Sequence, residues 1–108
     1  MAINVTLIDA QQPTVTSAVD SYTSPAGGNG TRIIAFTASL VTGTENYRVF
    51  VGLTASTAAE IIPARSITGP NSSSPLELVN HFIPPGEKVF VQVSTGTTIS
   101  FRASGIEF

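Results

Sequence analysis

Residues 31–41, TRIIAFTASLV, carry the strongest structural signal in the sequence, because apolar and polar side chains alternate along them. One face holds Ile34, Phe36, Ala38 and Leu40, while the other holds Thr31, Ile33, Ala35, Thr37 and Ser39. Successive side chains of a β-strand point to opposite sides, so this alternation predicts a strand with one face in a core. We expect the strand to begin near Thr31.

The same period of two recurs in four further stretches, each of which predicts another strand. They are NYRVFVGL (46–53), LELVNHFI (76–83), EKVFVQV (87–93) and TISFRAS (98–104). Residues 3–8 and 14–23 are also β-rich, but their alternation is weaker.

Residues 54–64, TASTAAEIIPA, leave two interpretations open. One is a single helical turn over residues 55–60. The other is a strand over residues 60–64, which Pro63 would confine to the edge of a sheet because proline has no amide hydrogen to donate.

Turn-forming residues separate these segments about every ten to twenty positions. In PPGE, residues 84–87, Gly86 can adopt the positive φ that a type II turn requires at its third position. We expect a tight hairpin there, joining residues 76–83 to residues 87–93. About seven or eight short strands without long helices predict an all-β fold, an antiparallel jelly-roll-like sandwich forming a single domain over residues 1–108.

The composition predicts a surface poor in charge and rich in hydroxyl groups. Only 11% of the 108 residues are charged, whereas the chain contains 12 Ser and 14 Thr. Such a surface costs little to desolvate and suits a subunit packed among others, although Thr is also enriched in strands of every function. Without Cys, no disulfide compensates for a small core, so association with other chains is expected to add stability.

Charge and hydropathy argue against two classes of partner. The formal net charge of −2 provides no basic surface for nucleic acid. No segment approaches the roughly 20 apolar residues of a membrane span, and the first residues do not read as a secretory leader. We therefore expect neither nucleic-acid nor membrane binding, and synthesis in a cytoplasm.

The titratable residues do not form a recognisable catalytic set. His81 is the only histidine, and its alternating neighbours are apolar or acidic, which favours a half-buried strand residue over a catalytic base or metal ligand. Glu77 and Glu87 flank the expected hairpin and are interpreted as surface carboxylates that keep an edge soluble. The sequence predicts a protein that is not an enzyme and has no cofactor, metal or catalytic residues.

The glycine-rich loop PAGGNG, residues 25–30, opens a strand and is not followed by the Lys and Ser or Thr of a phosphate-binding loop. Its glycines permit backbone angles that other residues avoid, as required where a chain changes sheet or approaches a neighbouring subunit. Arginine is enriched at interfaces, and the chain prefers it to lysine by four to one. The C-terminal Phe108 could pack on its own sheet or on a neighbour. The predicted interface residues are Gly27, Gly28, Asn29, Gly30, Arg32, Arg48, Arg65, Arg102 and Phe108.

Four phrases of the sequence resemble a group of small bacteriophage virion proteins. They are YTSPAGGNGTRIIAFTASLVTGTENYRVFV (22–51), IIPARSI (61–67), the Pro-Pro-Gly turn and ISFRASGIEF (99–108), so the resemblance covers residues 22–108 in outline. It implies a structural protein of the virion, either a capsid decoration or cement protein or a head appendage, assembled in the host cytoplasm. The implied partners are other virion proteins, chiefly the major capsid protein, and further copies of the chain, with a trimer favoured.

A second function class remains open at this point. A carbohydrate-binding or adhesin module with the same fold would use a loop edge and Tyr22, Tyr47 or a Phe as a stacking platform for sugar rings. Sandwich folds host both roles.

Overall fold

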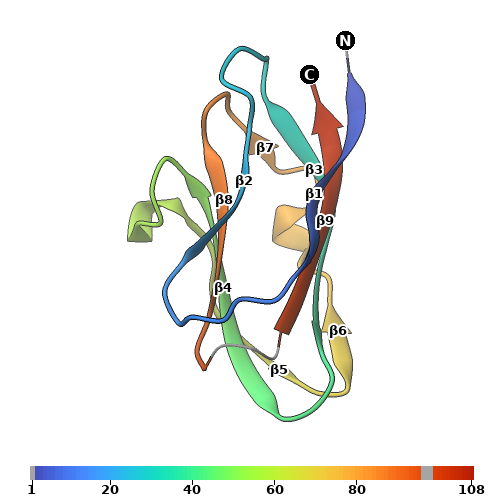
Figure 1. Cartoon of the computed structure of the whole chain (residues 1–108), viewed down its shortest axis with the longest axis vertical. Coiled ribbons are helices and arrows are strands. Elements are labelled where there is room, and N and C mark those ends of the chain that lie inside the picture. Colours follow the sequence, from blue (N-terminus) through green and yellow to red (C-terminus); the bar gives the residue numbers. More distant parts are fainter. Residues whose placement is uncertain (1, 96–98) are drawn as a thin grey trace.

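The computed structural model describes residues 2–95 and 99–108 and shows two antiparallel β-sheets packed face to face (Figure 1). The strands are β1 (Ile3–Gln11), β2 (Val19–Thr23), β3 (Thr31–Leu40), β4 (Thr44–Gly52), β5 (Glu60–Thr68), β6 (Asn71–Ser73), β7 (Phe82–Ile83), β8 (Lys88–Val93) and β9 (Ile99–Glu107). Two short 3₁₀ turns, η1 (Thr57–Ala59) and η2 (Leu76–Leu78), complete the regular structure of the described residues.

The strand pairings are nested, which is the arrangement of a jelly roll. Sheet A has the order β1-β9-β3-β6, with β7 also beside β3, and sheet B has the order β2-β8-β4-β5. The chain thus resembles one long hairpin, closed between β4 and β5 and rolled up so that successive pairs fall in alternate sheets. The predicted all-β, antiparallel, jelly-roll-like sandwich is confirmed. The described strands number nine because β6 and β7 share one position beside β3.

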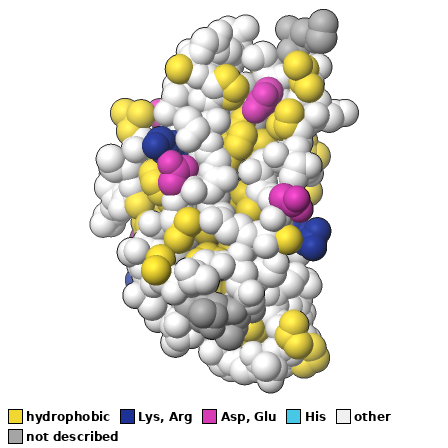
Figure 2. Space-filling model, viewed as in Figure 1, with side chains coloured by type: hydrophobic (Ala, Val, Ile, Leu, Met, Phe, Trp, Pro, Cys, Tyr) yellow, Lys and Arg dark blue, Asp and Glu magenta, His cyan; other side chains and the backbone are white. Residues whose placement is uncertain are grey.

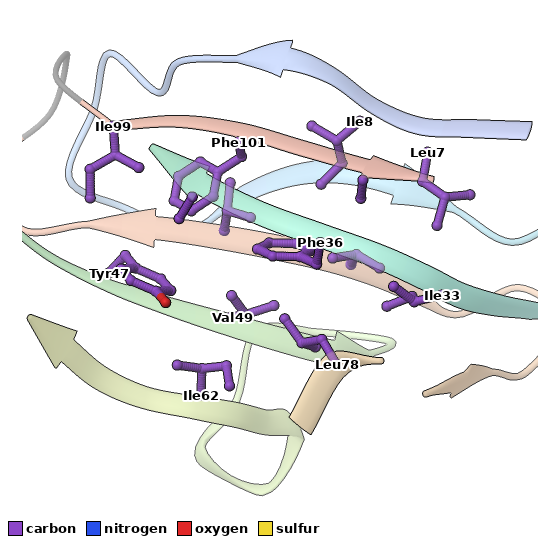
Figure 3. Packing of buried hydrophobic residues seen from close by; sticks show 14 of the residues in the cluster. Leu7, Ile8, Ile33, Phe36, Tyr47, Val49, Ile62, Leu78, Ile99 and Phe101 are labelled. Carbon is purple, nitrogen blue, oxygen red and sulfur yellow. The ribbon is translucent and has the colours of Figure 1, made fainter. Parts of the chain in front are cut away.

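The core lies between the sheets and is built from the inward-facing side chains of both (Figure 3). Phe101 from β9 is at its centre, with its ring centroid 6.0 Å from that of Phe36 and 5.9 Å from that of Tyr47. The Tyr47 ring is fully buried, and the Tyr47 hydroxyl forms a hydrogen bond with Ser73 Oγ at 2.9 Å. Aromatic rings from both sheets therefore pack against one another in the middle of the core.

The predicted face of β3 is correct only beyond Ile34. Phe36, Ala38 and Leu40 are buried as expected, but Ile34 is 41% exposed and Ile33 is fully buried in its place. The register against β9 shifts between Ile33 and Ala35, which marks a β-bulge. Because a bulge inserts one residue, it exchanges the faces of the strand on its two sides.

The strand predicted over residues 76–83 is wrong for most of its length. Residues 76–78 form η2 instead, which buries Leu78, and Asn80 adopts a positive φ of 64° that ends any extended run. The Asn80 amide donates to the Ile33 carbonyl at 2.7 Å, and the Ile33 amide donates to the His81 carbonyl at 2.9 Å. Only Phe82 and Ile83 form a strand, paired with β3.

The turn predicted at PPGE is confirmed, but the hairpin is wrong. Gly86 has a φ of +81°, and the Glu87 amide donates to the Pro84 carbonyl at 3.1 Å. However, β7 belongs to sheet A and β8 to sheet B, so the turn carries the chain from one sheet to the other. Glu77 and Glu87 therefore do not lie opposite each other across a hairpin, and Glu77 forms an ion pair with Arg65.

Both interpretations of residues 54–64 prove correct in part. A single 3₁₀ turn, η1, is followed directly by β5, which is an edge strand of sheet B. The register between β4 and β5 shifts around Pro63, as expected for proline at a bulged edge. In the ranges 2–95 and 99–108, no helix has the length and apolarity needed to cross a membrane.

Candidate functional site

The glycine loop and the C-terminal residue are held together at one end of the sandwich (Figure 1, top). The loop leaves β2 in sheet B and enters β3 in sheet A, so the expected change of sheet is confirmed. The Asn29 amide donates to the Phe108 carbonyl at 3.1 Å, and the Phe108 amide donates to the Gly30 carbonyl at 2.9 Å. The last residue therefore packs against its own chain, and these hydrogen bonds define the shape of the loop.

Gly30 is the position in this loop where glycine is required. Its φ is +102°, and a Cβ atom there would overlap the ring of Phe82. Only glycine combines this backbone conformation with so close an approach. The ring of Phe82 is thereby held over the loop while 42% of the residue stays exposed.

Arg32 lies between two partly exposed phenylalanines on the outer face of sheet A. Phe82 is directly opposite Arg32 in the pairing of β7 with β3. The Arg32 guanidinium carbon lies 6.0 Å from the ring centroid of Phe108, which is 39% exposed. We call the group Gly28, Gly30, Arg32, Phe82 and Phe108 the end patch. Phe82 was missed from the sequence because it was assigned to a longer strand.

The remaining predicted arginines lie elsewhere and do not join the end patch. Arg48 forms an ion pair with Glu60 at 2.8 Å, and Arg65 donates two hydrogen bonds to Glu77, at 3.2 and 2.5 Å. The hydrogen bonds from Arg65 lower the pKa of Glu77 below its usual value. Both guanidinium groups are thus engaged within sheet B and its neighbouring turn. Arg102 is on the outer face of sheet A.

A partly buried hydrogen-bond network lies beneath the end patch. The Tyr22 hydroxyl from sheet B donates to Glu107 Oε2 at 2.5 Å and lies 2.8 Å from Thr31 Oγ1. Ser24 Oγ lies 2.9 Å from the same Thr31 oxygen, and both Ser24 and Thr31 are fully buried. The network joins the two sheets at the end where the glycine loop crosses between them. It was missed because no sequence pattern pairs Tyr22 with Glu107.

Because of Tyr22, the stability of the fold is expected to decrease as the pH rises in the alkaline range. Burial, reinforced by the hydrogen bond to Glu107, raises the pKa of Tyr22 from 10.0 to about 12. The unfolded chain therefore releases this proton at lower pH than the folded protein. The stabilisation from the neutral hydroxyl is complete below pH 10 and is lost as the pH rises through 12.

We expect Tyr22→Phe to be less stable at pH 7 by about 1 to 2 kcal/mol, because Glu107 and Thr31 lose a hydrogen-bond partner. We also expect its urea midpoint to fall less than that of the wild type between pH 9.5 and 11.5. Because Tyr22 is partly exposed, solvent screening limits the difference between the two proteins in the fall of the urea midpoint. Equal slopes in the two proteins would show that Tyr22 does not carry the alkaline dependence.

Each sheet also has a shallow hollow on its outer face. The hollow on sheet B has a volume of about 220 Å³ and is lined by Asn46, Arg48, Gln92 and Ser94, among others. Gln92 Nε2 donates to the Thr16 carbonyl at 3.0 Å, and Arg48 is held by Glu60, so two of these polar groups are already engaged. The hollow on sheet A has a volume of about 270 Å³ and contains Arg102.

His81 is half-buried, as expected, but lies outside any strand. Burial lowers the pKa of His81, so its imidazole is neutral at pH 7. Within residues 2–95 and 99–108, no three His, Cys, Asp or Glu side chains gather closely enough to hold a metal ion. Tyr47 is buried and Tyr22 is engaged in the network, so the exposed rings of the end patch are Phe82 and Phe108.

No family model, curated protein or solved structure matches this chain. The resemblance to phage virion proteins stays a prediction, and the function is inferred from the geometry of the surface.

Proposed function

We propose that this protein is a non-enzymatic structural subunit of a phage virion, of the capsid decoration or cement type. In this role it binds other virion proteins, including the major capsid protein, and copies of itself through the end patch. The observation that carries the proposal is the placement of Arg32 between two partly exposed phenylalanines. Aromatic residues and arginine are the side chains most enriched at the centres of protein interfaces.

The rigidity of the end patch adds support. Its loop is tied to Phe108 by two backbone hydrogen bonds, and the Tyr22–Glu107–Thr31 network lies beneath it. A surface that is already ordered loses less conformational entropy when a partner binds. The patch is therefore suited to a contact made many times in the same geometry.

The sparse charge of the remaining surface supports the same role. Figure 2 shows one face on which few side chains are charged and most of the surface is uncoloured. Arg48, Arg65 and Lys88 each have a carboxylate partner within the chain. Such a surface is covered by neighbours at a small desolvation cost. Jelly rolls also build many viral capsid domains, which supports the proposal by analogy of fold.

We expect the purified protein to form a trimer, with a mass three times the 11.2 kDa of the chain, in light scattering at micromolar concentration. Arg32→Ala and Phe108→Ala are expected to reduce this mass to that of the monomer, since each removes a central side chain of the contact. Phe108→Ala keeps the backbone hydrogen bonds of the loop.

Val41→Ala is the matched control, because Val41 is exposed and follows the opposite end of β3. It should leave the mass unchanged. A monomeric wild-type protein would contradict self-association, and an equal loss of mass in all three variants would contradict the assignment of the contact to the end patch.

A further inference from the structure

Two β-bulges face each other across the same part of β9. The register of β1 against β9 shifts between Thr6 and Ile8, and that of β3 shifts between Ile33 and Ala35. Both shifts fall opposite residues 103–105 of β9. Bulges bend and twist their strands and are frequent beside functional sites. The hollow of about 270 Å³ on the outer face of sheet A lies at this place.

The pairing register places polar side chains around the hollow in two neighbouring rows. In the first row, Ser104 lies between Thr6 on β1 and Ala35 on β3. In the second row, Arg102 lies directly opposite Thr37. All five residues line the hollow, so three hydroxyl groups surround a small apolar side chain and a guanidinium group.

Arg102 differs from the other arginines in having no carboxylate or ring partner among the described residues. Arg48 and Arg65 are held in ion pairs, and Arg32 lies over the ring of Phe108. The exposed carboxylate of Asp9 lines the same hollow. In the hollow, the guanidinium of Arg102 only donates hydrogen bonds, the carboxylate of Asp9 only accepts them, and the three hydroxyl groups can do both.

We propose that this hollow binds a neutral sugar unit of a glycan. A sugar ring presents hydroxyl groups that donate to Asp9 and accept from Arg102, while its apolar C–H face packs against Ala35. An anionic ligand would be attracted by Arg102 but repelled by Asp9, so the hollow offers an anion no net charge advantage. An apolar ligand would leave the hydroxyl and charged groups without hydrogen bonds. Binding at this site does not depend on the assembly role proposed above.

The size of the hollow fits a single ring. Its volume of about 270 Å³ lies just below the roughly 300 to 1,000 Å³ of sites for drug-sized ligands. A sugar unit has about a dozen non-hydrogen atoms, and at the modest affinity per atom of an open site its Kd is on the order of 1 mM. No aromatic ring lines the hollow to tighten binding.

The experiment is a titration of the ¹⁵N-labelled protein with glucose, galactose, mannose and N-acetylglucosamine, followed by amide chemical shifts. Glucuronate serves as the anionic probe. At least one neutral sugar is expected to give saturable shifts at residues 35–37 and 102–104. Arg102→Ala is expected to weaken binding at least tenfold, and Thr37→Val, which removes only a hydroxyl group, to weaken it less.

Arg48→Ala is the matched control, because it removes the arginine from the hollow on the opposite sheet. It should leave the Kd unchanged. The proposal is overturned if none of the four neutral sugars gives saturable shifts, if only glucuronate binds, or if Arg102→Ala binds as tightly as Arg48→Ala. The titration does not measure the mass of the assembly, so the two proposals fail separately.

Discussion

Phe101→Ala is expected to lower the free energy of unfolding by about 3 to 5 kcal/mol. Phe101 is fully buried at the centre of the sandwich, in contact with Phe36 of the same sheet and Tyr47 of the other. Truncation removes both ring contacts and leaves a cavity that the two sheets cannot close without moving. Because natural domains have only roughly 5 to 15 kcal/mol of stability, the variant should be close to unfolding at ambient temperature.

Urea denaturation followed by circular dichroism measures this loss, with Phe82→Ala as the control. Phe82 undergoes the same chemical change but is 42% exposed, so its truncation should cost less than half as much. Both variants and the wild type are compared at a protein concentration low enough for the monomer, because Phe82 also belongs to the proposed contact and association contributes to apparent stability. Equal losses would contradict the central position of Phe101 in the core.

Gly105→Ala should have the second-largest effect, a loss of about 3 kcal/mol. Gly105 lies on β9 between Val5 of β1 and Ile33 of β3. A Cβ atom there would overlap the Arg32 carbonyl oxygen and lie 2.9 Å from Leu7 Cδ1. The obstacle is largely backbone, so a side-chain rotation cannot remove it, and a neighbouring strand has to shift.

Gly27→Ala is the control for this substitution. No atom lies within 4 Å of a Cβ added at Gly27, and its φ is not positive. Its stability should stay within about 0.5 kcal/mol of the wild type, as for most surface substitutions. Thermal unfolding compares the two variants. A Gly105→Ala protein that unfolds at the same temperature as Gly27→Ala would show that β9 tolerates a wider spacing from its neighbours.

The sequence predicted those parts of the fold that depend on local chemistry. Alternation in β3, β4, β8 and β9 identified the strands, and Gly86 identified its turn. The exposure of Ile34 was not predictable in this way, because the bulge that turns it outward is a property of the pairing with β9. Local alternation indicates a strand, but its partner sets the register.

Residues 76–83 show the same limit in another form. Their alternation of apolar and polar residues predicted a strand, but η2 buries Leu78 and leaves Leu76 82% exposed, so the alternation does not correspond to one buried face. The strand is interrupted at Asn80, whose positive φ of 64° is stabilised by backbone hydrogen bonds between residues 80–81 and Ile33 of β3. The hairpin prediction at Pro84 failed because it relied on this strand.

The surface was predicted only in part for a similar reason. The glycine loop, Arg32 and Phe108 were identified as candidates, and the structure places them together. The ion pairs of Arg48 and Arg65 and the bond from Tyr22 to Glu107 join residues that are distant in the sequence. Such contacts follow from topology, and composition does not reveal them.

The nested pairing of the strands also implies an order in which the native structure forms. Among the described strands, only β4 and β5 are both consecutive along the chain and paired, across residues 53–59, and every other pair must close a longer loop, up to β1 with β9. Each pair that forms brings the ends of the next pair closer and reduces the entropy lost in closing it. We therefore expect β4 and β5 to pair first and the outer strand pairs to form after them. Folding should take roughly milliseconds to seconds, as in other proteins whose contacts join residues distant in the sequence.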